Sequence, residues 1–457
     1  MLTDRVVALA HRYWRSVFAQ SRTLERALCC GLGSLLALGR RTITNSILAR
    51  NLVDQDWSAD YKVFSRSQWS ESDLFDASFT VFLDRYPGRD VPVALDDTKL
   101  CKSGRRIPHA GWQRDPLSPP FHTNLIWGLR FIQASVLYPH HIEAELPARG
   151  VPVAFVDAPA VNKPRRQASE QERALYRREQ RERNLSRQAV DLITGLRARL
   201  DHLGGRGRQL VMAMDGSFCN RTVFRASLDR VTLLARTRKD ARLCLPAPPG
   251  SRRRYAAETF TPEEVRLNES IPWRTAEVML GSSRHTVPYK EVHDVRWRGA
   301  AGTRPLRLIA IAPQPYRVKA DGGKNYRQPA YLLTTDLATP AGELIQIYVD
   351  RWQIEVNHRD EKDLIGVGQA QLWSEQAVPR QPAFIVALYA LLLVASLLEF
   401  GPGRSSAFMP LPPWRKNATR PSLLDLLTIA RRELYEADVS PPRLRITAST
   451  LLAAAHT

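Results

Sequence analysis

Three carboxylates stand out because of the sequence that precedes them. Asp96 and Asp97 follow a short apolar run, Val91 to Leu95, and Asp215 follows a second run, Gln209 to Met214. Such runs are typical of buried strands, where a carboxylate is costly unless a cation compensates it. Converging carboxylates suit Mg²⁺, which prefers oxygen ligands, and two such ions can assist phosphoryl transfer. Taken singly, each acid is equally compatible with a turn residue or a helix cap.

A further acid, Glu355, lies in a segment that caps and period predict to be a helix over Gly342 to Asp363. At positions i, i+3, i+7 and i+14, one helix face would carry four side chains: Tyr348, Arg351, Glu355 and Lys362. This face combines a metal-binding acid, two cations suited to phosphates and an aromatic donor. A purely structural salt-bridge face would more often repeat Glu and Lys. The spacing therefore indicates a helix that meets metal and phosphate together.

The charge of the chain points to an anionic partner. The 457 residues include 66 Lys and Arg against 46 Asp and Glu, giving a net charge of +20. Nucleic acid is the first candidate partner and an anionic membrane surface the second. Residues 163–208 carry a net charge of +7 and residues 221–254 carry +8, so fifteen of the excess charges flank Asp215. Because the second stretch has almost no acids to pair with, nucleic-acid contact is favoured there.

The elements that must position these residues divide the chain into four regions. Residues 1–88 read as a helical N-terminal DNA-binding domain, which ends where Pro87-Gly88 changes the period. An α/β catalytic core is expected over 89–220 and 331–375, interrupted by a β-rich insertion over 221–330. Residues 376–457 are expected to form a helical C-terminal region.

Two features bear on the compartment. The five cysteines form no Cys-x-x-Cys pair, and the N-terminus places charges and a Trp where an apolar signal core would be. The strongest apolar run, Ala383 to Leu398, is short of the roughly 20 residues that span a bilayer. We therefore expect a reduced, cytoplasmic protein in which this run is a buried helix.

The glutamate segment resembles the Tyr-Arg-Glu-Lys signature of bacterial insertion-sequence transposases in the DDE superfamily, whose catalytic core is RNase H-like. The Asp-Asp-Thr sequence at Asp96, followed by Lys102 and Gly104, and the Asp-Gly sequence at Asp215 are similar to the same group. The 140-residue interval from Asp215 to Glu355 leaves room for the β-rich insertion of that group. The resemblance covers about residues 40 to 400.

The resemblance implies cut-and-paste DNA transposition through a hairpin intermediate, with Mg²⁺ in a two-metal site (Mn²⁺ as a possible substitute). Asp97, Asp215 and Glu355 would bind the metals, with Asp96 as the alternate first carboxylate. Asp97 is preferred because the Thr follows it directly, although strand alternation points only one of the two into the site. DNA phosphates would contact Tyr348, Arg351 and Lys362. The implied partners are double-stranded DNA, as terminal inverted repeats and target, and a second copy of the chain in a homodimer. The protein would associate with the bacterial nucleoid.

Some alternatives stay open. Hairpin-forming relatives hold a flipped base on an aromatic ring, for which Trp273 and Trp297 are candidates, although both are better explained as insertion core residues. His358, one turn beyond Glu355, could assist at the metal site or lie on the helix surface. A catalytically inactive DNA-binding regulator derived from a transposase is the first rival function. Another RNase H-like nuclease is the second, and a carboxylate-pair glycosidase is a distant third.

Overall fold

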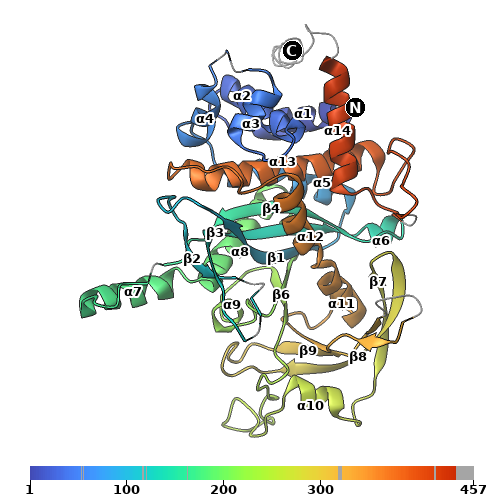
Figure 1. Ribbon diagram of the computed structural model, residues 1–457. Coiled ribbons are helices and arrows are strands. Elements are labelled where there is room, and N and C mark those ends of the chain that lie inside the picture. The colour runs from blue at the N-terminus through green and yellow to red at the C-terminus, as the bar shows by residue number, and fades with distance from the viewer. Residues whose placement is uncertain are drawn as a thin grey trace.

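A computed structural model describes residues 1–438 except 53, 55, 116, 117, 120, 162, 317–321, 416 and 417, so the end of the expected C-terminal region lies outside the described residues. Helices of the two chain ends form one layer, a mixed sheet lies next to it, and a strand-rich lobe extends the sheet at the far side (Figure 1).

The central sheet contains the RNase H-like core that the resemblance implies. Strand β3 lies between β4 and β1 and is antiparallel to both, while β5 and β6 follow on the other side of β1 and run parallel to it. The short β2 pairs with the beginning of β3. The bounds are β1 (Val91–Cys101), β2 (Gly111–Arg114), β3 (Leu125–Tyr138), β4 (Arg149–Asp157), β5 (Leu210–Met214) and β6 (Val231–Arg236).

The region after residue 236 is rich in strands, as expected for the insertion, and its strands continue the same sheet. The expected start at residue 221 is too early, because β6 pairs in parallel with β5 of the core. Strand β12 pairs with β6, and β9, β8 and β7 then follow in antiparallel order. Most of the apolar side chains of these strands are buried, so the lobe has its own core against helix α11. The bounds are α9 (Arg221–Phe224), α10 (Pro262–Leu267), β7 (Arg274–Leu280), β8 (Ser283–Val295), β9 (Leu306–Ile311), β10 (Pro315–Tyr316), β11 (Asn325–Tyr326) and β12 (Ala330–Thr334).

Helices from the two chain ends share one core. The Trp14 and Phe384 rings lie 5.4 Å apart, and the Glu433 carboxylate accepts hydrogen bonds from the backbone N–H groups of Leu2 and Thr3. The helical nature of both regions is confirmed. The bounds are α1 (Leu2–Trp14), α2 (Ser21–Leu36), α3 (Ile43–Ala49), α4 (Ser58–Ser65), the 3₁₀ turn η1 (Ser72–Phe75), α5 (Asp76–Arg85), α13 (Ala377–Phe400) and α14 (Leu423–Asp438).

Helix α13 contains the apolar run that sequence placed in the interior. It is the one helix of the described residues that is long and apolar enough to cross a membrane, yet 83% of its most apolar window is buried inside the protein. It packs against α1, α5 and β4 at once, which explains why it is apolar on every side. The expectation of a buried helix is confirmed.

The remaining helices connect the strands of the core. Helix α7 has no buried residue and projects from the body of the protein (Figure 1), whereas α8 packs its apolar face on the core. The single helix expected over 342–363 is wrong in detail, because it breaks after Asp350 and ends in a π-helical turn. The bounds are α6 (His140–Glu143), α7 (Glu170–Glu182), α8 (Leu185–His202), α11 (Ala341–Asp350), α12 (Gln353–Arg359) and the π turn η2 (Asp360–Leu364).

Candidate active site

Two carboxylates meet at the ends of neighbouring strands. Leu95 of β1 is in register with Met214 of the parallel β5, so Asp96 and Asp215 occupy the next positions side by side. Burial, and then the negative charge of Asp215, raise the pKa of Asp96 to about 7. Asp215 also accepts hydrogen bonds from the backbone N–H (3.0 Å) and hydroxyl (2.6 Å) of Ser217, which is the turn role that its sequence context allowed.

Asp96 and Asp97 point to opposite faces of the sheet. The Asp96 Oδ2 atom lies 3.7 Å from Arg351 Nη1, which places it on the face covered by α12. Burial also raises the pKa of Asp97, but the charges that oppose this rise come first from Lys99 and Arg130 on the other face. The structure therefore places Asp96, the alternate of the two, beside the glutamate segment.

Arg351 joins the glutamate segment to β1. Its Nη2 donates to Glu355 Oε1 at 3.1 Å, and its guanidinium carbon lies 5.5 Å from the centre of the Tyr348 ring. Within the described chain, the buried Nε and Nη1 atoms of Arg351 find no hydrogen-bond partner. Three of the four predicted side chains thus gather on one face beside Asp96, although the helix is broken between them.

Lys362 takes a different place from the one that ideal helix spacing gives it. It lies in the π turn, where five residues rather than four close each hydrogen-bonded ring, so the helical phase shifts. Burial lowers its pKa, against the charges of Glu361, Cys101 and Asp97, which places the ammonium toward the distal half of β1. Lys362 therefore approaches Asp97 rather than the Arg351–Glu355 pair.

A buried hydrogen-bonded pair, not predicted from the sequence, holds the π turn on the sheet. The Gln133 amide donates to Glu361 Oε1 at 2.8 Å, and Gln133 is the register partner of Asp96. Burial raises the pKa of Glu361 to about 8. Glu361 is buried on the same helical face as Ile354 and Asn357, at positions i, i+3 and i+7, but the helical period does not show that its partner is Gln133 of β3.

His358 is half-buried. Its Nε2 atom is enclosed and has no hydrogen-bond partner among the residues described here. Burial, together with the charges of Lys362 and Arg351, lowers the pKa of His358 to about 3. The imidazole is therefore neutral at physiological pH, and its ring faces the protein rather than open solvent.

A family comparison decides the identity of this arrangement. The family model of DDE superfamily endonucleases matches residues 16–305, well over half of the chain. The chain belongs to the DDE superfamily. The match includes Asp96, Asp97 and Asp215 and ends before Glu355. A search of curated proteins gives no match.

Membership gives this DDE endonuclease a coarse function. It supports a transposase or nuclease activity and implies DNA as the substrate. DDE endonucleases are in general dependent on divalent metals.

The carboxylates fit a divalent cation in part. Asp96 and Asp215 offer oxygen ligands whose mutual repulsion a hard cation would relieve. Glu355 is held by Arg351, and in the described ranges no three Asp, Glu, His or Cys side chains lie close enough together to hold a metal ion. A three-carboxylate site in this DDE endonuclease therefore requires the Arg351 side chain to move away from Glu355.

The two candidate tryptophans of the insertion differ in environment. Trp297 packs against Phe224 with ring centres 5.8 Å apart, as expected for a core residue. Trp273 is 45% exposed, and the Lys290 ammonium lies 4.6 Å from its ring centre. Among the residues that the structure describes, no hydrogen bond joins either ring to the carboxylates at the ends of β1 and β5.

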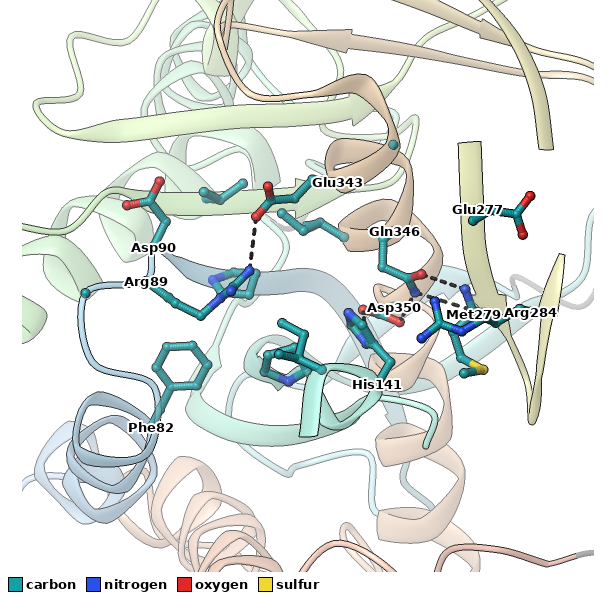
Figure 2. Close-up of a pocket in the computed structure, with 17 residues that line it drawn as sticks. Phe82, Arg89, Asp90, His141, Glu277, Met279, Arg284, Glu343, Gln346 and Asp350 are labelled. Atoms are coloured by element: carbon teal, nitrogen blue, oxygen red, sulfur yellow. Dashed lines mark hydrogen bonds and ion pairs between the residues drawn. The ribbon is translucent and has the colours of Figure 1, made fainter. Parts of the chain in front are cut away.

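A cavity lies on the far side of α11 from Glu355. Its volume is about 490 Å³, and Figure 2 shows Asp350 and Gln346 of α11 facing His141 and the β7–β8 hairpin. The Gln346 amide donates to Asp350 at 2.9 Å and bonds the backbone of Met279 on β7. None of the candidate carboxylates Asp96, Asp97, Asp215 and Glu355 lines this cavity. The Gln346 hydrogen bonds at its wall connect α11 to the insertion.

Proposed function

We propose that this DDE endonuclease is a cut-and-paste transposase of the Tyr-Arg-Glu-Lys group. It would cleave DNA at terminal inverted repeats, form a hairpin intermediate and join the freed 3′-hydroxyl to target DNA. The observation that carries the proposal is the meeting of Asp96, Arg351 and Glu355 beside Asp215, since it joins acids for metal to a cation for phosphate in one place.

Asp96, Asp215 and Glu355 are the catalytic acids in this proposal. Asp96 replaces Asp97 because it shares a sheet face with Arg351 and lies beside Asp215. Mg²⁺ or Mn²⁺ bound by these acids would supply the charge that activates a water or hydroxyl and stabilises the leaving oxygen. Asp97 would instead support Lys99, Arg130 and Lys362.

Arg351 has two alternative partners in the proposed reaction. Without DNA its guanidinium holds Glu355 and faces Asp96. A guanidinium binds phosphate as well as carboxylate, so a DNA phosphate would draw Arg351 away and release Glu355 to join the other two acids. Tyr348, whose ring lies against the guanidinium, and Lys362 would contact neighbouring phosphates.

Basic surface supports the choice of DNA as substrate. The stretch 221–254 carries a net charge of +8 and exposes Arg242, Arg252, Arg253 and Arg254, so it presents cations to a DNA backbone. We further propose that two copies of the chain act together, each on one transposon end.

The test is cleavage by the Glu355→Gln variant on a labelled transposon end. We expect DNA binding close to wild type and loss of metal-dependent cleavage. Glu343→Gln is the matched control, because Glu343 lies on the adjoining α11 and is exposed. Cleavage by the Glu355→Gln variant at the wild-type rate would refute the assignment.

The products separate this proposal from its rivals. A cut-and-paste transposase is expected to produce hairpin ends. Another RNase H-like nuclease is expected to produce nicks without hairpins. Binding without any metal-dependent cleavage by the wild-type protein would identify an inactive regulator.

A further inference from the structure

An aromatic surface lies on the β2–β3 hairpin, outside the residues assigned so far. Trp112 of β2 and Trp127 of β3 are directly opposite each other, with ring centres 5.7 Å apart at an angle of 71°. The Arg105 guanidinium lies 4.6 Å from the first ring centre and 5.1 Å from the second. We call these three residues the tryptophan pair with Arg105.

The pair is fixed in place while one ring stays open to solvent. The Trp127 indole N–H donates to the carbonyl of Gly104 at 3.0 Å. Gly128 lets β3 approach β1 closely, because a Cβ atom there would lie 2.3 Å from the Leu100 carbonyl oxygen. Trp112 is nevertheless 57% exposed. A large ring held rigidly at the surface buries little area in the fold and is available to a ligand.

The pair lies on the same face of the sheet as Asp96. Asp96 is in register with Gln133, and side chains two residues apart on a strand share a face. Trp127 lies six positions before Gln133 on β3, and because this offset is even, the two side chains point to the same face of the sheet. At about 3.3 Å per residue the tryptophan pair is roughly 20 Å from Asp96. A DNA strand crossing the carboxylates would cover that length with roughly six nucleotides at 3.4 Å each.

The surroundings of the pair are cationic. Arg105, Arg106 and Arg114 are exposed, and the Lys99 ammonium donates to the Arg114 carbonyl at 2.6 Å. Among the described residues, no carboxylate forms an ion pair with Arg105, so its charge is available to a phosphate. Aromatic faces together with unpaired cations are the combination that binds single-stranded nucleic acid.

We propose that the tryptophan pair with Arg105 stacks the bases of an unpaired DNA segment that lies roughly 20 Å from Asp96 along β3. The ligand is an unpaired strand because the base faces of a duplex are covered by their neighbours, whereas a free base can stack on an exposed indole. The inference rests on the proposed function, which brings DNA to Asp96. It adds that the DNA is opened on the side of the β2–β3 hairpin.

The test compares forked and blunt DNA of one sequence, with 2-aminopurine in the unpaired arm. Binding is measured without metal, so no cleavage is involved. Base stacking on an aromatic ring corresponds to roughly 1–3 kcal/mol, and we expect Trp112→Ala to bind the fork about 10-fold more weakly while blunt binding is retained. Trp112→Phe keeps a ring and should retain most of the fork affinity. Trp414→Ala, which removes an 87% exposed indole far along the chain, is the control and should bind as wild type does.

The fluorescence gives a second, independent result. Stacking quenches 2-aminopurine, so the wild-type protein should quench it and Trp112→Ala should not. Equal fork binding by wild type and Trp112→Ala, or equal loss of fork and blunt binding, would overturn the inference. Because the assay reads binding alone, it can fail while Glu355→Gln still abolishes cleavage, and it can succeed if the cleavage assignment is wrong.

Discussion

Two buried carboxyl groups, Asp96 of β1 and Asp350 at the end of α11, have similarly raised pKa values but differ in the second influence on them. Burial is the largest cause for both Asp96 and Asp350, and each has a pKa of about 7. The second influence on Asp96 is the charge of Asp215, which raises its pKa further. The second influence on Asp350 is the hydrogen bond from Gln346, which lowers it.

This difference separates a site for a ligand from a structural contact. The Gln346 amide, which also bonds β7, gives Asp350 a neutral donor within the protein. Asp96 faces another acid, and its partners are the Arg351 guanidinium at 3.7 Å and the backbone N–H of Asp97, which donates to Oδ1 at 2.8 Å. A raised pKa therefore does not identify a catalytic carboxylate by itself, and the second carboxylate in register is what distinguishes Asp96 from Asp350.

The largest effect is expected from removing the charge of Asp96. Loss of a metal-binding catalytic acid costs several kcal/mol of transition-state stabilisation, so Asp96→Asn should lower the cleavage rate by about 10³-fold or more. Asp97→Asn, one residue away on the opposite face, should lower it by less than about 10-fold. Single-turnover cleavage of a labelled transposon end measures both rates.

Metal binding gives the same comparison without catalysis. Mg²⁺ or Mn²⁺ should raise the Tm of wild type and of Asp97→Asn but not that of Asp96→Asn, since only a native metal site couples binding to stability. If Asp97→Asn were the variant that lost both the Tm shift and cleavage, the first acid would be Asp97.

An intermediate effect is expected from Arg351→Ala. A charge-assisted hydrogen bond contributes about 1.5–3 kcal/mol, so loss of the phosphate contact should lower cleavage by about 10–100-fold. Arg351→Lys keeps the charge but loses the two-pronged geometry and should recover only part of the rate. Cleavage assays at saturating DNA would distinguish this from weak binding, and a wild-type rate for Arg351→Ala would contradict the role.

The smallest effect on cleavage is expected from Asp350→Asn. Asparagine keeps an oxygen for Gln346, so cleavage should stay within about 2-fold of wild type. Stability should depend on pH instead. The folded-state pKa of Asp350, about 7, lies above that of an unfolded Asp, so its stabilising contribution is complete below about pH 4 and is lost as pH rises through 7.

The Asp350→Asn variant should therefore have a Tm a few degrees above wild type at pH 8 and no such advantage near pH 4. Thermal unfolding across this range measures the difference. An unchanged Tm difference at every pH would show that Asp350 does not titrate in the folded protein, and a large loss of cleavage would remove the contrast with Asp96.

Much of the architecture was predictable from the sequence because apolar patterns are local. The runs before Asp96 and Asp215 form strands, the run at Ala383 forms the buried α13, and the region after 221 is rich in strands. The side-by-side placement of α1 and α14 was not predictable, because it depends on contacts between chain ends more than 400 residues apart.

The site divides in the same way. Its residue types and the grouping of Tyr348, Arg351 and Glu355 follow from sequence spacing. The sequence does not show which of the two adjacent aspartates faces that group, because strand alternation establishes only that they point to opposite faces. The packing of β1 against β5 and α12 decides that Asp96 is the one that faces it. The π turn likewise shifts the helical phase at Lys362 without any sign in the helical period.

The net charge of +20 and the acids at the ends of two apolar runs by themselves predict an anionic partner and carboxylates at the edge of a sheet. Only the tertiary structure distinguished Asp96 from Asp350 and placed Trp112 on the same face of the sheet as Asp96. Composition and spacing are properties of neighbouring residues, whereas the face, partner and burial of a side chain depend on segments that meet only when the chain folds.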